Sequence, residues 1–381
     1  MPIYDISPTW RNEVQNKARG GIPTCDNSSI SGDLVAWNKI KTLLEKSQNN
    51  GTAFSQGIVS TYSLVYIRAY AWGGGVLAPN GDIHFVPYNA NRGQKININN
   101  GVVSTYSLVY AITSDAYFGG VLAPNGDIHF VPFAANRGQK INSSGVVSTY
   151  SLVYARAYAY SGGVLAPNGD IHFVPYDADR GQKINSSGVV STYSLVYTGQ
   201  VVALAYSGGV LAPNGDIHFV PYAADRGQKI NSSGVVSTYS LVYIGTYKGG
   251  VLAPNGDIHF IPYGTTTVGQ KISSSGVVST YSLAYTIVSG YSGGVLAPNG
   301  DIHFVPNIST VGQKINSSGV VSTYSLVYSN RFFEKSSGGV LSPNGDIYFV
   351  PLDADRGQKL STLPAKPLNI GLCCSPFLNK F

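Results

Sequence analysis

The chain has 381 residues, a formal charge of +6 and only 12% charged residues, about half the usual share. Because 43% of the residues are hydrophobic, the composition excludes a disordered chain, and no apolar run of ~18 residues predicts a membrane span. No basic run is present, so the slight excess of Lys and Arg predicts no nucleic-acid partner. The many Gly, Ser, Val and Tyr residues favour an all-β protein with tight turns.

Residues 1–56 precede the repeats and are expected to form an N-terminal arm. Trp37, Ile40 and Leu44 lie on one face at helical spacing, so we expect a single helix over residues 33–48. No apolar signal segment precedes it, so we expect synthesis in the cytoplasm.

Residues 57–361 contain two alternating signatures, each present seven times. GGVLAPNGDIHFVP begins at Gly74, and GVVSTYSLVY occurs first as GIVSTYSLVY from Gly57. The Asp of the first signature recurs at spacings of 41 to 46 residues, which is typical of a four-stranded propeller blade. Its seven copies are Asp82, Asp127, Asp170, Asp216, Asp257, Asp301 and Asp346.

Each unit predicts four strands, GGVLAP, DIHFVP, RGQKI and VVSTYSLVY. Asn-Gly joins the first two as a two-residue hairpin turn, in which both positions need a positive φ and Ala78 pairs with Ile83. Pro79 is expected just before this turn, and NSSG forms the turn between the third and fourth strands. The Gly-Gly pair that opens the first strand suits the crowded position nearest the axis of a ring.

The order of the strands predicts how the ring closes. The repeats begin with a fourth strand, from Gly57, and end with a third strand near Ser361. We therefore expect residues 57–66 to pair with residues 338–361 in one composite blade, which removes the free edges of an open array. The sequence thus predicts a seven-bladed β-propeller with end-to-end closure.

Residues 362–381 form a partly apolar C-terminal tail. The three cysteines, Cys25, Cys373 and Cys374, lie outside the repeats and lack CxxC spacing, so no zinc site is expected. Free thiols are expected, with a bridge between Cys25 and either tail cysteine as the alternative.

Sequence variation between the repeats gathers in two loops, the link from the fourth strand to the next blade and the link between the second and third strands. Both loops emerge on the same face of an up-and-down blade, and loops on a rigid scaffold commonly carry binding sites. Two sets of residues on this variable face are candidate ligand contacts. The aromatic set is Tyr70, Trp72, Tyr117, Phe118, Tyr158, Tyr160, Tyr206, Tyr247, Tyr291, Phe332 and Phe333. The basic set is Arg92, Arg137, Arg180, Arg226 and Arg356.

Both sets have a structural alternative. One aromatic residue per loop can instead fill the gap between neighbouring blades. Each Arg follows an Asn or Asp, and the fifth and sixth repeats carry Thr-Val in place of both, so a local pairing is also consistent. If the Arg residues do contact a ligand, an anionic glycan or an acidic partner would prefer the arc that keeps them.

The histidines offer no predicted metal site or catalytic centre. All six occupy one repeat position, and Tyr348 takes the seventh, which indicates a planar hydrogen-bonding group within a strand. The Asp after each Asn-Gly is expected to bond the turn backbone. No cofactor motif is present and no repeat breaks the symmetry with its own acid-base pair, so the sequence predicts that the chain is not an enzyme.

GGVLAPNGDIHFVP, RGQKI and GVVSTYSLVY resemble repeat-built β-propeller proteins, in particular tandem-repeat proteins of marine bacteriophages and other viruses. The resemblance covers residues 57–361 and lacks the WD dipeptide and the sialidase Asp-box. It implies a virion structural or adhesion protein whose variable face binds a host glycan or another virion protein. The alternatives are a cellular scaffold and a lectin with one sugar site in each blade gap.

Overall fold

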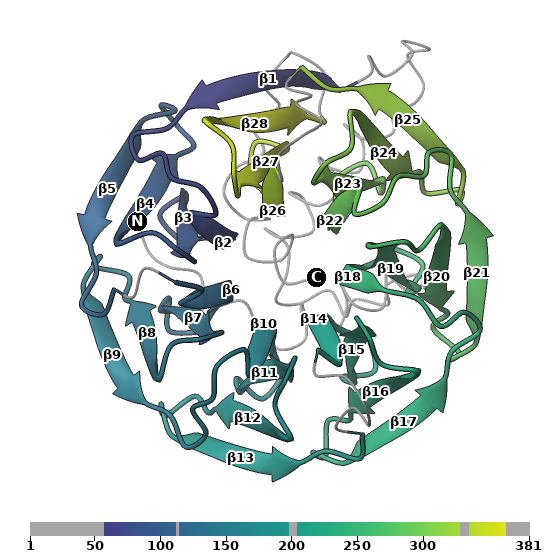
Figure 1. Cartoon of the computed structure of the whole chain (residues 1–381), viewed down its shortest axis with the longest axis horizontal. Helices are drawn as coiled ribbons and strands as arrows, with labels where there is room; N and C mark the ends of the chain where they lie inside the picture. Colours follow the sequence, from purple (N-terminus) through teal and green to yellow (C-terminus); the bar gives the residue numbers. More distant parts are fainter. Residues whose placement is uncertain (1–56, 112–113, 198–203, 328–334, 363–381) are drawn as a thin grey trace, which may run out of the picture.

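The computed structural model describes residues 57–111, 114–197, 204–327 and 335–362, and these form seven four-stranded antiparallel sheets around a central axis (Figure 1). The seven-bladed, all-β propeller is therefore confirmed. The expected helix, the three cysteines and the tail beyond Thr362 lie outside the described residues. Among the described residues, no helix is long and apolar enough to cross a membrane.

Each blade contributes one strand to each of four layers (Figure 1). The innermost strands are β2 (Trp72–Leu77), β6 (Tyr117–Leu122), β10 (Tyr160–Leu165), β14 (Tyr206–Leu211), β18 (Tyr247–Leu252), β22 (Tyr291–Leu296) and β26 (Ser336–Leu341). The second strands are β3 (Asp82–Pro87), β7 (Ile128–Pro132), β11 (Ile171–Pro175), β15 (Ile217–Pro221), β19 (Ile258–Pro262), β23 (Ile302–Pro306) and β27 (Asp346–Pro351).

The third strands are β4 (Arg92–Asn97), β8 (Arg137–Ile141), β12 (Arg180–Ile184), β16 (Arg226–Ile230), β20 (Val268–Ile272), β24 (Val311–Ile315) and β28 (Arg356–Ser361). The outermost strands are β5 (Val103–Ser107), β9 (Val147–Ser151), β13 (Val190–Ser194), β17 (Val236–Ser240), β21 (Val278–Ser282), β25 (Val321–Ser325) and β1 (Ile58–Ser63). Blade 1 is β2–β5, the blades follow in chain order, and blade 7 combines β26, β27 and β28 with β1.

Blade 7 closes the ring as the sequence predicts. Strand β1 pairs with β28 from Ile58 opposite Ser361 to Ser63 opposite Arg356. The Tyr62 hydroxyl also donates a hydrogen bond of 3.1 Å to the carbonyl of Phe349. Residues from the two ends of the repeat array therefore share one sheet.

The hairpin turn differs from the predicted one. Leu77, not Ala78, pairs with Ile83, and the Gly81 amide donates to the Ala78 carbonyl at 3.0 Å. Gly81 has φ +88° and Asn80 is not among the residues with positive φ. The loop is a type I turn followed by a glycine bulge, because Pro79 at its second position holds a negative φ that a type I′ turn forbids. The predicted register is therefore wrong by one residue.

Glycine at the axis has the role expected from the sequence. A Cβ placed on Gly119 would lie 2.9 Å from the Cα of Gly162, and one on Gly162 would lie 3.2 Å from the Cα of Gly208. In the first five blades the innermost strands thus approach each other too closely for a side chain at this position, whereas an added Cβ on Gly293 in blade 6 would meet no atom within 4 Å.

We expect Gly119→Ala to lower the free energy of unfolding by about 3 kcal/mol, the sum of a left-handed backbone penalty and an overpacking penalty. Gly145→Ala is the matched control, since Gly145 has a similar φ of +82° but no atom within 4 Å of its added Cβ. Its expected loss is about 1 kcal/mol. Urea unfolding measures the free energy of unfolding of both variants. Equal losses would show that the close contact at the axis adds no cost to an alanine at Gly119.

A third glycine allows the blade core to form. The ring of Tyr106 on β5 lies over Gly93 on β4, where an added Cβ would be 2.1 Å from the ring. The Tyr106 hydroxyl lies 3.2 Å from Nδ1 of His84 on β3. One tyrosine therefore ties the outermost strand to the second strand across the glycine.

Candidate functional site on the variable face

Six of the predicted aromatic contacts are buried in the structure. Trp72 is 1% exposed, and Tyr117 is fully buried, with its ring 5.8 Å from that of Phe130. The other four, Tyr160, Tyr206, Tyr247 and Tyr291, are at most 2% exposed. The prediction that these six meet a ligand is wrong, because the innermost strand begins two residues before the Gly-Gly pair and turns its first side chain into the blade core. They fill the space between blades, which the sequence left open as the alternative.

Two of the remaining aromatic candidates are exposed and conformationally constrained. Tyr70 is 41% exposed and Tyr158 is 44% exposed, and their φ angles of 54° and 61° are left-handed. Asp115 and Ser289 have the same conformation at the equivalent loop position. A non-glycine residue held there costs about 1 to 2 kcal/mol, and such strain gathers at functional sites. Phe118 is half-buried, whereas Phe332 and Phe333 lie outside the described residues.

The predicted Arg residues are exposed, and four of them stack on a tyrosine of the preceding blade. The guanidinium of Arg92 lies 5.0 Å from the ring of Tyr66, which follows the outermost strand of the preceding blade. Arg180 lies 4.8 Å from the ring of Tyr154 in the same way, and the stacking recurs for Arg137 and Arg226. A hydrogen bond of 2.8 Å from Arg180 lowers the pKa of Asp179. The local pairing predicted as an alternative is confirmed for Arg92, Arg180, Arg226 and Arg356.

A buried glutamine that was not among the predicted site residues lies next to these pairs. The Gln94 side chain is fully buried, and its Oε1 accepts hydrogen bonds from the amides of Tyr66 and Val65 at 2.7 Å and 3.1 Å. Gln139, Gln182, Gln228, Gln270 and Gln313 make the equivalent contact to the preceding blade. The outermost strand therefore ends earlier than predicted, because its Leu-Val-Tyr segment crosses to the next blade.

The histidines and aspartates have structural partners within each blade. Burial, and then the charge of Lys95, lowers the pKa of His84 to about 4, and the other five histidines behave alike. Tyr348 takes the equivalent position with its ring 5.7 Å from that of Tyr62. In the described residues, no group of three or more His, Cys, Asp or Glu residues could hold a metal ion. The hydrogen bond expected of this position is present in four blades, between a tyrosine hydroxyl and Nδ1 of His84, His129, His172 or His218, whereas Nδ1 of His259 and His303 has no hydrogen-bond partner.

The Asp that follows each Asn-Gly has a different partner from the predicted one. Asp82 Oδ2 lies 2.5 Å from Nζ of Lys95, and Oδ1 of Asn80 instead accepts the turn amide at 3.0 Å. The same Asp–Lys pair occurs in all seven blades. The expected bond from Asp to the turn backbone is therefore wrong.

Most residues of the aromatic surface on the variable face were not among the predicted ligand contacts. We call it the aromatic patch: Tyr88, Phe118, Phe133, Tyr158, Tyr176, Tyr222 and Tyr263. Its rings form a continuous series with centroids 5.1 to 6.0 Å apart, which runs across blades 1 to 5. The sequence signal was an aromatic residue after the Pro that ends each second strand, which Asn307 and Leu352 replace in blades 6 and 7.

A lysine and an aspartate complete the aromatic patch. Nζ of Lys248 on β18 lies 5.1 Å from the ring of Phe118 on β6 and 4.8 Å from that of Tyr263. Because β6 and β18 belong to opposite sides of the ring, this contact crosses the central axis (Figure 1). Tyr158 donates to Asp115 at 3.4 Å, while burial and a hydrogen bond with Asp115 raise the pKa of Tyr88. The patch thus combines tyrosine hydroxyls and one charge of each sign with rings that range from buried Phe133 to exposed Tyr158.

No protein-family model and no curated protein matches the chain. Solved structures are similar in fold. A streptogramin B lyase has a TM-score of 0.70 at 18% identity, covering 81% of this chain and 99% of the lyase. A catalytically inactive virginiamycin B lyase from Staphylococcus aureus with quinupristin has a TM-score of 0.70 at 17% identity, covering 80% and 99%.

A further similar structure is the extracellular domain of a hybrid two component system from B. thetaiotaomicron. It has a TM-score of 0.61 at 12% identity and covers 79% of this chain, which spans about two fifths of that domain. At these identities the likeness shows the propeller fold alone.

Two sequence-based inferences change with these comparisons. The prediction that the chain is not an enzyme is contradicted, because propellers that superpose on four fifths of it include lyases. Missing motifs were a poor criterion, since catalytic residues on a propeller need no fixed sequence spacing. The resemblance to viral repeat proteins finds no support here, as the similar structures with a stated source are bacterial.

Proposed function

We propose that the chain is a recognition propeller that docks a protein partner on the aromatic patch. The observation that supports this most is the unbroken series of rings over blades 1 to 5, which gives a sevenfold scaffold one asymmetric surface. Tyrosine-rich surfaces with few charges are typical of binding hot spots. The backbone of Tyr158, an exposed member of the patch, is held in the left-handed conformation, and the backbone of exposed Tyr70 has the same conformation.

Photo-crosslinking tests this proposal. With p-benzoylphenylalanine in place of Tyr158, we expect a discrete cross-linked protein in cells or particles that contain the chain. With the same residue in place of Thr192, which is exposed in the middle of the outermost strand β13, we expect none. Tyr222→Ala should weaken cross-linking at position 158 about tenfold, the effect of losing a hot-spot ring. Equal cross-linking at both positions would refute the docking surface.

The proposed setting is a virion, in which the propeller serves as a structural or adhesion protein made in the host cytoplasm. Near-identical repeats and low charge support a rigid module of this kind. Mass spectrometry of purified particles tests the setting, and particles that lack the chain would point to the cellular scaffold instead.

A further inference from the structure

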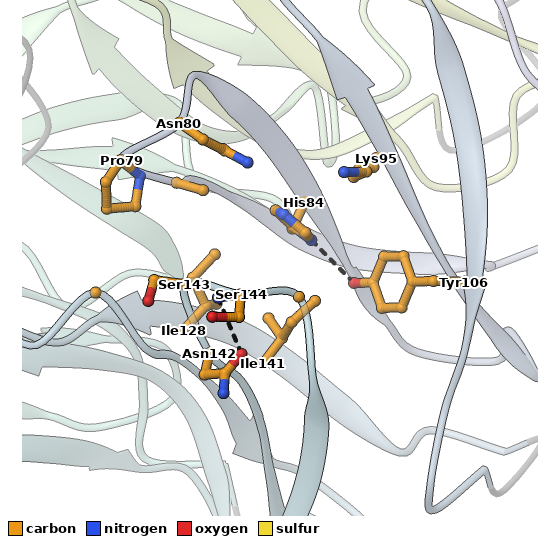
Figure 2. Close-up of a pocket in the computed structure, with 13 residues that line it drawn as sticks. Pro79, Asn80, His84, Lys95, Tyr106, Ile128, Ile141, Asn142, Ser143 and Ser144 are labelled. Carbon is orange, nitrogen blue, oxygen red and sulfur yellow. Dashed lines mark hydrogen bonds between the residues drawn. The ribbon is translucent and has the colours of Figure 1, made fainter.

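A cleft of about 380 Å³ lies between blades 1 and 2, on the face that carries the hairpin turns (Figure 2). Pro79, Asn80 and His84 line it from blade 1, and Ile141 and Ser144 line it from blade 2. Its size falls within the range of small-molecule sites. The cleft is on the face opposite the aromatic patch, so it is independent of the proposed docking surface.

The walls of the cleft combine apolar and hydroxyl groups. Ile128 and Ile141 supply an apolar side from blade 2, and Tyr106 adds a ring from blade 1. Ser143 and Ser144 are exposed at the rim, where their hydroxyl groups can donate and accept hydrogen bonds. A ligand that fits must therefore carry both C–H surface and hydroxyl groups.

Charge in the cleft is internally balanced. Lys95 lines the cleft, but its Nζ is paired with the buried carboxylate of Asp82 at 2.5 Å. The Nδ1 atom of His84 lies 3.2 Å from the Tyr106 hydroxyl, and its Nε2 has no hydrogen-bond partner among the described residues. This histidine nitrogen is thus available to a neutral hydroxyl, whereas no unpaired cation attracts an anion.

The same framework recurs around the ring. A Cβ on Gly126 would lie 3.7 Å from Cγ of Pro79 in the preceding blade. The equivalent separations, all between 3.6 and 3.9 Å, are Gly169 to Pro124, Gly215 to Pro167, Gly256 to Pro213 and Gly300 to Pro254. Each of these five gaps has the histidine, lysine and tyrosine on one side and a serine-rich turn on the other.

We propose that these five blade gaps, from 1/2 to 5/6, are repeated binding sites for the uncharged, hydroxyl-bearing ring of a carbohydrate. The other two gaps differ, because Tyr348 replaces the histidine in blade 7 and Ser361 and Thr362 replace the serine-rich turn that faces blade 6. Five weak sites on one rigid face bind a clustered glycan far more tightly than a single site binds one sugar. The propeller then engages a protein on one face and a sugar-coated surface on the other.

Native mass spectrometry with galactose, glucose, mannose, fucose and N-acetylglucosamine tests the proposal. We expect up to five bound molecules of at least one of these sugars, and four after Ser144→Trp fills the first gap. A variant with Trp at Ser144, Ser187, Ser233, Ser275 and Ser318 should bind none. The matched control places Trp at five exposed serines of the outermost strands, Ser107, Ser151, Ser194, Ser240 and Ser282, and should keep all five sites.

Three outcomes overturn the proposal: no bound sugar from this panel, full binding by the five-Trp variant, or preferential binding of sialic acid. Thermal unfolding checks that each variant is folded. If the five-Trp variant does not fold, the single Ser144→Trp variant tests the proposal: four bound sugars support it, and five bound sugars contradict it. Loss of sugar binding leaves cross-linking at position 158 unchanged, so this proposal and the protein-docking proposal fail separately.

Discussion

Between about pH 6.5 and pH 4 we expect the propeller to lose most of its stability, because its six histidines are buried in the neutral form. The pKa of each is lowered to about 4 in the folded ring, whereas an unfolded chain titrates near 6.5. Above pH 6.5 both states are neutral and the histidines have no effect. Below it only the unfolded chain gains protons, which favours unfolding increasingly until pH 4.

The expected size of this effect is large compared with the stability of a typical protein. A shift of this extent amounts to about 3 kcal/mol per histidine at pH 4, and six add to the order of 20 kcal/mol. Folded proteins are commonly stable by only about 5 to 15 kcal/mol. Urea unfolding followed by circular dichroism should therefore show a loss on the order of 10 kcal/mol between pH 7.5 and pH 5.

Blade 7 supplies the control for the acid effect. Tyr348 occupies the histidine position there and packs on Tyr62, so His172→Tyr introduces a residue that the same blade architecture already accommodates. The substitution should recover about 2 kcal/mol at pH 5 relative to its effect at pH 7.5. A free energy of unfolding that stays constant from pH 7.5 to pH 5 would contradict the assignment of the histidines as buried neutral groups.

Removal of the closing strand should have the second large effect. A chain that starts at Ile67 lacks β1, which covers β28 along its whole length. It also lacks Tyr62, whose ring lies over Gly357. The backbone amides of Val65 and Tyr66, which donate hydrogen bonds to Gln94, are lost as well. These losses expose a sheet edge and part of the blade 7 core, so we expect the melting temperature to fall by at least ~10 °C.

Thermal unfolding of this shortened chain is best compared with a chain that starts at Gly57, since both lack residues 1–56. A synthetic peptide of residues 57–66 should restore much of the lost thermal stability when added to the shorter chain. A melting temperature within ~2 °C of that of the longer chain would show that ring closure contributes little.

Repetition made most of the fold predictable. The Gly-Gly pair and the Asp at position 82 recur in every repeat, which predicts seven similar blades. The repeats start with a fourth strand at Gly57 and end with a third strand, which predicts that the two ends of the array share one blade. The turn was misjudged because Asn-Gly alone indicates a two-residue hairpin, whereas Pro79 before it selects the longer loop. The turn type is therefore determined by the fixed φ angle of Pro79 and not by the Asn-Gly pair alone.

The candidate site was harder to predict because burial and ring geometry determine it. An aromatic residue such as Tyr160, two residues before the Gly-Gly pair, has the same local sequence whether it faces solvent or the next blade. From the sequence alone Gln94 resembles a surface residue. It is buried because the preceding blade provides backbone amides that donate hydrogen bonds to its side chain. The contact between Phe118 and Lys248 joins residues 130 positions apart and exists only because the ring brings them across the axis.

The composite blade also makes exchange of a strand between molecules possible. In six blades all four strands are consecutive in the chain. In the seventh blade, the outermost strand β1 comes from the opposite end of the repeat array. During refolding, the nearly identical repeats compete as partners, and β1 of one molecule can enter the vacant place in another. Monomer yield should therefore fall as protein concentration rises, with linked dimers and longer chains of exchanged molecules taking its place.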